Sequence, residues 1–209
     1  MLFVSLITLF YSTQVFASYC KMEDTLFSVG NYTCPDNYTM VTRIKGFYCL
    51  KVVASTLNQT QSEQSCMLEN STLASFENID EVNLVLELSL VATNNANGYC
   101  WIGATRLAAC HGPISDFNAG CLPVETNTFR WTDGFVTGTD AFSNFYPGQP
   151  DGGSGVAQNC IGMISTSSSW IGMTPGSFDD TQCGSTLASS HVCGQPAQQV
   201  ALNCSSSCC

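Results

Sequence analysis

The stretch Tyr99-Cys100-Trp101-Ile102 is an apolar and aromatic run of the kind that forms a buried strand. Comparable short runs recur along the chain, at Phe47-Tyr48-Cys49-Leu50, Phe129-Arg130-Trp131, Cys160-Ile161-Gly162-Met163-Ile164 and His191-Val192-Cys193. They are bounded by Gly, Ser, Asn and Pro residues, which favour turns. The pattern predicts a domain with several short strands joined by loops.

Two further segments have helical patterns. Thr60-Gln61-Ser62-Glu63 has the spacing of a capping box and leads into Cys66-Met67-Leu68. The second segment runs from Asn78 to Val91 and has apolar residues at helical spacing after its first turn. The interval from about 133 to 180 is rich in Gly, Ser and Pro and is expected to be loop, which in a compact domain is usually functional or pinned by a crosslink.

The start of the chain predicts secretion. Residues 1–17 hold an apolar run that ends at Ala17, as in a signal peptide, although a basic residue is missing at the start. A signal anchor is the alternative, but the run is shorter than the roughly 18 to 20 residues that a membrane span needs. All 13 cysteines follow residue 17, which fits an oxidising, extracellular location. Five sequons predict N-glycosylation, at Asn31, Asn37, Asn58, Asn70 and Asn203.

The charge balance excludes one class of partner. The chain has 16 acidic residues and only 6 Lys and Arg residues, which gives a formal charge of -10. Phosphate backbones and anionic lipid surfaces are bound by clusters of basic side chains. We therefore expect neither nucleic acid nor an anionic membrane as a partner.

Three segments supply oxygen ligands of the type that calcium prefers. Their side chains are three carboxylates and two amides, from Gln149, Asp151, Gln158, Asp179 and Asp180. An ordinary turn at Gln149-Pro150-Asp151 and a solvated charge pair at Asp179-Asp180 are the alternatives. Together the three segments favour a Ca²⁺ site.

The chain resembles the C-type lectin-like domain family over roughly residues 34 to 194. The resemblance rests on the core-strand motif Trp101-Ile102-Gly103-Ala104, the strand and turn Phe129-Arg130-Trp131-Thr132-Asp133-Gly134, and the long-loop residues Asn144-Phe145 with Gly148-Gln149-Pro150-Asp151. It implies an α+β fold in which two helices flank small antiparallel sheets and a long loop carries the ligand site. The expected organisation is a signal peptide at 1–17, an extension at 18–33, the domain at 34–195 and a Cys-rich tail at 196–209.

The resemblance also implies disulfides. The expected pairs are Cys34 with Cys49, Cys66 with Cys193, and Cys160 with Cys183, while Cys110 and Cys121 flank an insertion and are expected to pair with each other. This leaves Cys20, Cys100, Cys204, Cys208 and Cys209, whose pairing is open. Because the cysteine count is odd, at least one is free or bonds another molecule, so we expect a disulfide-linked oligomer. The alternative is that Cys20 bonds Cys204 and the last two cysteines pair together.

The implied function is calcium-dependent carbohydrate binding, with glycans or glycoproteins as partners. In this family the amide-then-carboxylate order of Gln149 and Asp151 accompanies galactose-type ligands, and Gln149, Asp151, Gln158 and Asp179 are expected to contact sugar. Gln158 stands where the family usually has Glu, and Asp179 where it usually has Asn. An aromatic ring usually follows the tripeptide, whereas this chain has Gly152-Gly153-Ser154-Gly155; Trp170 is a candidate ring, with core packing as its alternative.

Two other functions are weighed against the lectin. A glycosidase needs little more than a pair of carboxylates, but no nucleophile elbow or helical His pair accompanies the three aspartates. We therefore do not expect an enzyme, and we expect His191 to be structural. The closer alternative is a calcium-independent lectin-like module that binds a protein partner, which Gln158 and the missing ring favour.

Overall fold

The computed structural model describes residues 32–112, 119–136, 138–153 and 157–200. The described residues fall into two units, Cys34–Pro196 and a short ribbon. In the ribbon, β1 (Tyr32–Thr33) pairs antiparallel with β10 (Gln198–Gln199). The predicted signal peptide lies outside the described residues, as do Asn31, Asn203, Cys20, Cys204, Cys208 and Cys209.

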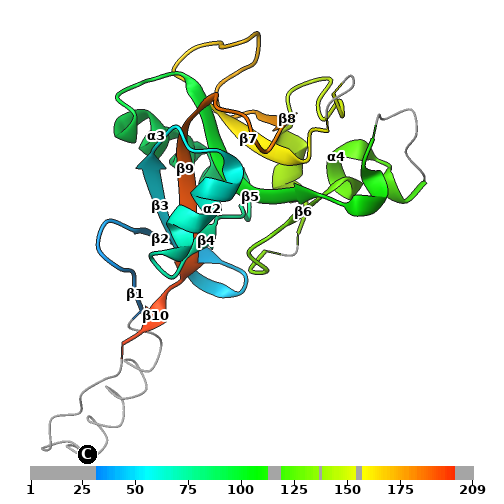
Figure 1. Cartoon of the computed structure of the whole chain (residues 1–209). Coiled ribbons are helices and arrows are strands. Elements are labelled where there is room, and N and C mark those ends of the chain that lie inside the picture. Colours follow the sequence, from blue (N-terminus) through cyan, green and yellow to red (C-terminus); the bar gives the residue numbers. More distant parts are fainter. Residues whose placement is uncertain (1–31, 113–118, 137, 154–156, 201–209) are drawn as a thin grey trace, which may run out of the picture. The chain divides into compact units, whose positions relative to one another are not determined.

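The larger unit is built on an eight-stranded sheet (Figure 1). Its main path runs β2 (Thr39–Arg43), β3 (Gly46–Ala54), β9 (Ala188–Pro196), β5 (Gly98–Arg106), β7 (Cys160–Ser165) and β8 (Phe178–Thr181). The two short strands β4 (Thr72–Leu73) and β6 (Phe129–Trp131) join β9 and β5. The β5–β9 pair is parallel and the others are antiparallel, so the sheet is mixed where only antiparallel pairing was expected.

Two helices cover opposite faces of this sheet. Helix α2 (Gln59–Met67) buries Cys66 in a cluster with Tyr99 and Trp101. Helix α3 (Ile79–Ala92) buries Val82 and Val85 in the larger cluster on the other face. The described residues also form four short helical segments, at Ala108–Cys110 (η1), Ala119–Cys121 (η3), Val124–Asn127 (α4) and Asp140–Asn144 (η4).

The observed N-terminal caps of α2 and α3 can be compared with the caps that the sequence predicts. Asn78 caps α3 as expected, since its side chain accepts from the Glu81 amide at 3.1 Å. The capping box of α2 begins two residues earlier than the sequence pattern indicates. Asn58 accepts from the Gln61 amide at 2.9 Å, and the Gln61 side chain accepts from the Asn58 amide at 3.1 Å. Glu63 instead accepts from the Leu73 amide at 2.8 Å, which fixes β4 beside the helix.

Gly103 of β5 lies at a position where there is no room for a side chain. A Cβ atom at this position would lie 2.1 Å from the carbonyl oxygen of Leu73, so no larger residue fits without moving β4. The close approach lets the Gly103 amide donate to the Ala74 carbonyl at 2.8 Å. Gly103 therefore joins the β4 segment to β5 through backbone contact.

Disulfides crosslink the unit at four places. The bonded pairs are Cys34–Cys49, Cys66–Cys193, Cys110–Cys121 and Cys160–Cys183, which are the four pairs that were expected. Cys100 is buried in β5 and is the one free cysteine of the described residues. Burial raises the pKa of its thiol to about 12, so it is a neutral core residue at physiological pH.

Three of the predicted glycosylation sites lie in the described part of the chain. Asn37 and Asn70 are exposed and adopt left-handed backbone conformations, with φ of 67° and 57°. Asn58 is half-buried as the cap of α2. No helix in the described ranges is long and apolar enough to span a bilayer.

Candidate functional site

The turn at Gln149–Asp151 is anchored by its backbone. The Asp151 amide donates to the Gln149 side-chain oxygen and to Asp180 Oδ1, both at 2.9 Å. The Gly152 amide donates to Asp180 Oδ2 at 3.0 Å, and the Gly153 amide donates to Asp151 Oδ1 at 2.9 Å. Pro150 is buried after a cis peptide bond, while Asp151 is exposed. The turn thus presents a carboxylate to solvent on a fixed backbone.

Asp180 is the anchor for this turn and is itself neutralised. It is fully buried in β8, and its carboxylate forms an ion pair with Arg106, the last residue of β5. Burial raises the pKa of the Asp180 carboxyl, which the Arg106 charge and the two loop amides oppose. Burial likewise lowers the pKa of the Arg106 guanidinium, and the Asp180 charge opposes that change. A guanidinium stays protonated in proteins, so the pair is ionic.

Asp179 lies on the other face of β8. Successive side chains of a strand point to opposite faces, and the contacts here agree. Tyr99 belongs to the cluster that packs on the α2 side of the sheet, called the α2-side cluster below. It donates its hydroxyl to Asp179 Oδ2 at 2.5 Å. Burial raises the pKa of Asp179 to about 6, against the effect of the Tyr99 hydrogen bond. The structure therefore brings Asp180 to the Gln149–Asp151 turn and directs Asp179 away from it.

Gln158 and its neighbour Asn159 approach the site from a third segment. The carbonyl of Gln158 accepts from Arg106 Nε at 2.7 Å, and the carbonyl of Asn159 accepts from the Arg106 amide at 2.9 Å. The side-chain oxygens of both residues are buried and have no hydrogen-bond partner among the described residues. Asn159 was not predicted as a site residue.

The five predicted ligands do not form a calcium shell in this arrangement. Calcium requires about 6 to 8 oxygens and several negative charges around one point. Asp180 is already bonded to a guanidinium and two amides, and Asp179 faces the opposite side of β8. Asp151 is left as the exposed carboxylate of the set, with neutral oxygens from Gln149 and Gln158. The residues present therefore do not fit the ion that the family resemblance implies.

Arg106 is the site residue that sequence reasoning missed. It is one of only 6 basic residues in the chain, and it ends a strand whose other side chains are almost all buried. Arginine is seldom buried without a partner. A basic residue at the end of an apolar run was therefore a usable signal for a buried acidic partner, although it could not identify Asp180.

Trp170 is half-buried and packs against the edge of the core. Its ring lies edge-on against Tyr99, with 5.4 Å between ring centroids, and it borders the α2-side cluster. Tyr99 in turn holds Asp179. The contact with Tyr99 supports the packing role for Trp170.

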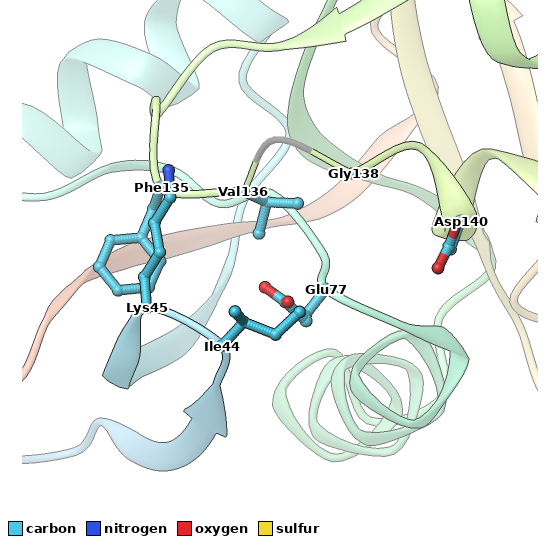
Figure 2. A pocket seen from close by; sticks show the side chains of 7 residues that line it. All are labelled: Ile44, Lys45, Glu77, Phe135, Val136, Gly138 and Asp140. Atoms are coloured by element: carbon cyan, nitrogen blue, oxygen red, sulfur yellow. The ribbon is translucent and has the colours of Figure 1, made fainter.

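A separate pocket of about 200 Å³ lies between the β2–β3 turn and the segment around 135–140 (Figure 2). Apolar side chains and charges of both signs line it, from Ile44, Phe135, Val136, Lys45, Glu77 and Asp140. Lys45 also donates to the Gly134 carbonyl at 3.2 Å. None of the five predicted ligands lines this pocket.

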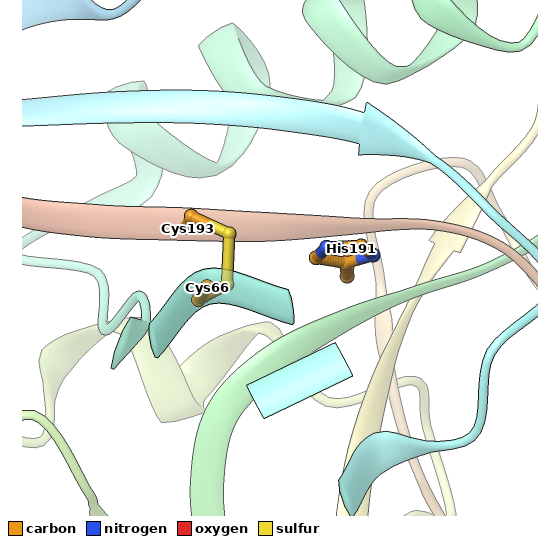
Figure 3. Close-up of side chains that lie close together, drawn as sticks. All are labelled: Cys66, His191 and Cys193. Atoms are coloured by element: carbon orange, nitrogen blue, oxygen red, sulfur yellow. A yellow bond between two sulfur atoms is a disulfide. The ribbon is translucent and has the colours of Figure 1, made fainter. Parts of the chain in front are cut away.

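His191 lies beside the Cys66–Cys193 disulfide (Figure 3). The ligand atoms of the three residues lie within 4.8 Å of one another, a spacing that could hold a metal. The two sulfur atoms are bonded to each other, however, and metals bind thiolates. His191 is fully buried, and its Nδ1 lies 2.7 Å from the Ser55 hydroxyl. The cluster is structural.

His191 gives a pH-dependent prediction. Burial lowers its pKa to about 4, whereas an unfolded histidine titrates near 6.5, so the unfolded chain binds the extra proton between these values. The stability contributed by neutral His191 is therefore complete above about pH 6.5 and is lost as pH falls to about 4. Relative to His191→Gln, wild-type stability should fall by about 3 kcal/mol between pH 7 and pH 4.

Urea unfolding of both chains at several pH values measures this difference. Asp179 acts in the opposite direction, because its raised pKa makes the folded chain bind the extra proton as pH falls through about 6. That contribution is common to both chains and cancels in the comparison. A constant stability difference from pH 7 to pH 4 would show that His191 does not titrate as described.

The fold and the loop geometry define the class of protein. The described domain, with its two helices, mixed sheet, long loop and disulfides, has the C-type lectin-like fold. Residues 37–206 match the sequence model of the family described as C-type lectin domain-containing protein 141/158. The chain belongs to this family. A comparison with curated protein sequences gave no significant match.

Solved structures with this fold include calcium-dependent and calcium-independent proteins. The carbohydrate-recognition domain of cow CD23 is 22% identical, with a TM-score of 0.52 over 80% of this chain and 98% of that one. A Ca²⁺-dependent type II antifreeze protein is 25% identical, with a TM-score of 0.51 over 78% and 99%. The Ca²⁺-independent lectin SPL-2 of Saxidomus purpuratus is 18% identical, with a TM-score of 0.52 over 78% and 93%.

Proposed function

We propose that the chain is a secreted carbohydrate-binding module and that Gln149 and Asp151 form its ligand site, beside Gln158. The observation that carries this proposal is the exposed Asp151 carboxylate, whose backbone amide is fixed by two hydrogen bonds. Sugar hydroxyls donate to carboxylates and accept from amides. A fixed carboxylate beside an amide can therefore recognise a pair of neighbouring hydroxyls.

The chemistry of the turn favours galactose-type ligands. The amide of Gln149 precedes the carboxylate of Asp151, and this is the order that accompanies galactose-type binding in similar lectins. Gln158 borders this turn through its backbone, and its side-chain oxygen is buried without a hydrogen-bond partner among the described residues. Calcium is not part of this proposal, because the arrangement of Asp179 and Asp180 does not suit it.

A glycan array with the secreted, full-length chain tests the proposal. We expect galactose-terminated glycans to bind, and we expect Asp151→Ala to weaken binding at least about tenfold, since a hydrogen bond to a charged group contributes about 1.5 to 3 kcal/mol. Asp36→Ala is the matched control, because Asp36 is also exposed but lies in the Cys34–Cys49 segment. It should leave binding unchanged.

Reversing the order of the two groups should change specificity. Gln149→Glu with Asp151→Asn places the carboxylate first and the amide second, which exchanges the hydrogen-bond donor and the acceptors at the two positions. Preference should shift from galactose-like toward mannose-like glycans on the same array. If no glycan binds the wild type with calcium or with chelator, the alternative of a module that recognises a protein partner replaces this proposal.

A further inference from the structure

The Arg106 guanidinium connects three segments at the base of the long loop. It pairs with Asp180 of β8, donates through Nε to the Gln158 carbonyl at 2.7 Å, and lies 4.7 Å from the centroid of the Phe129 ring. Its side chain is 1% exposed and that of Asp180 is 0% exposed. The charge pair is therefore shielded from solvent and salt.

Asp180 connects Arg106 to the Gln149–Asp151 turn. Its two carboxylate oxygens accept from the amides of Asp151 and Gly152, while the same carboxylate holds Arg106. The chain of contacts runs from β5 through Arg106 and Asp180 to the backbone beside Asp151. A single positive charge thus neutralises the buried carboxylate and ties two separate parts of the loop to the sheet.

We propose that Arg106 is a built-in cation that takes the place of the calcium ion implied by the family resemblance, so that the Gln149–Asp151 turn keeps its conformation without calcium. A metal ion at this point would have to displace the guanidinium from Asp180 and leave it buried without that charge partner, which is strongly unfavourable. Gln158 strengthens the preference, because it is neutral where similar lectins usually have a carboxylate. The inference concerns loop conformation and holds whether the ligand is a glycan or a protein.

Thermal unfolding of the wild type in calcium and in EGTA is the first test. Calcium sites of extracellular modules have dissociation constants of about 0.1 to 1 mM, so about 5 mM calcium would occupy such a site and raise the Tm. We expect the two Tm values to agree within about 1 °C. A wild-type Tm that falls by several degrees in EGTA would overturn the proposal, and this experiment requires no variant to fold.

Substitutions at Arg106 are the second test. Arg106→Gln leaves Asp180 buried without its charge partner and should lower the Tm by about 10 °C. Arg130→Gln is the matched control, because Arg130 is exposed on β6, and it should leave the Tm unchanged. Arg106→Gln with Asp180→Asn removes both charges and should recover much of the loss. A Tm of Arg106→Gln equal to that of the wild type would contradict the role of Arg106.

A gain of calcium binding is the third test. Arg106→Gln with Gln158→Glu removes the guanidinium and adds a carboxylate, which gives the charge that a calcium site requires. The Tm of this variant should rise by several degrees with calcium and fall with EGTA, and isothermal titration should detect the ion. No calcium response would show that Arg106 is not what excludes the ion. Because every readout is stability or calcium binding, these results are independent of whether the wild type binds a glycan.

Discussion

Removal of the Cys66–Cys193 disulfide should lower the free energy of unfolding by about 5 kcal/mol and sharply reduce the amount of secreted protein. The two cysteines are 127 residues apart in sequence and join α2 to β9. In the chain-entropy account, a crosslink over so long a loop strongly restricts the unfolded chain. The double substitution Cys66→Ala with Cys193→Ala tests this in urea and leaves no unpaired thiol at the site.

The Cys110–Cys121 disulfide is the matched control for this prediction. Its cysteines are 11 residues apart, so Cys110→Ala with Cys121→Ala should cost about 3 kcal/mol, roughly 2 kcal/mol less than the long-range pair. Both variants remove the same atoms. An equal loss in the two variants would show that loop length does not determine what these disulfides contribute.

Arg43→Met should destabilise the domain by about 3 to 5 kcal/mol. Arg43 ends β2 and contacts Glu81 in the first turn of α3, with Nε to Oε1 at 2.9 Å and a second bond at 2.7 Å. The two side chains are 0% and 5% exposed. The substitution leaves the Glu81 carboxylate buried without its charge partner, and this accounts for the expected loss.

Two further variants test whether burial of the ion pair causes the loss of stability expected for Arg43→Met. Lys51→Met breaks a pair of the same length with Glu69, but those side chains are 21% and 44% exposed, so the cost should be at most about 1 kcal/mol. Arg43→Met with Glu81→Leu removes both buried charges and should be more stable than Arg43→Met alone. A similar loss from Lys51→Met and Arg43→Met would mean that burial is not the cause.

Much of the fold could be predicted because its signals are local. All five apolar runs that predicted strands lie in β3, β5, β6, β7 and β9, and the Asn78 cap marks the start of α3. β8 was missed, since Phe178-Asp179-Asp180-Thr181 lacks the apolar character of a typical strand. This segment forms a strand because β7 pairs with it, with Gly162 opposite Asp179 and Ile161 opposite Asp180.

The candidate site was predictable only in part. The sequence places Gln149, Asp151, Gln158, Asp179 and Asp180 in three segments, and the structure brings the Gln149–Asp151 turn, Asp180 and the Gln158 backbone together. The sequence could not indicate in which directions the Asp179 and Asp180 side chains point, because their segment was expected to be loop. Once 178–181 is a strand, its alternation sends Asp179 to Tyr99 and Asp180 to Arg106.

By itself the sequence determined which segments form five of the strands, where α3 begins and the amide-then-carboxylate order of the Gln149–Asp151 turn, because each depends on residue types close together in the chain. The fold class followed from the family resemblance. The tertiary structure alone decided which charge meets Asp180. Arg106 and Asp180 are separated by 74 positions and meet because β5, β7 and β8 are neighbours in one sheet. Burial then makes their pairing obligatory, since either charge left alone in that interior would be strongly destabilising.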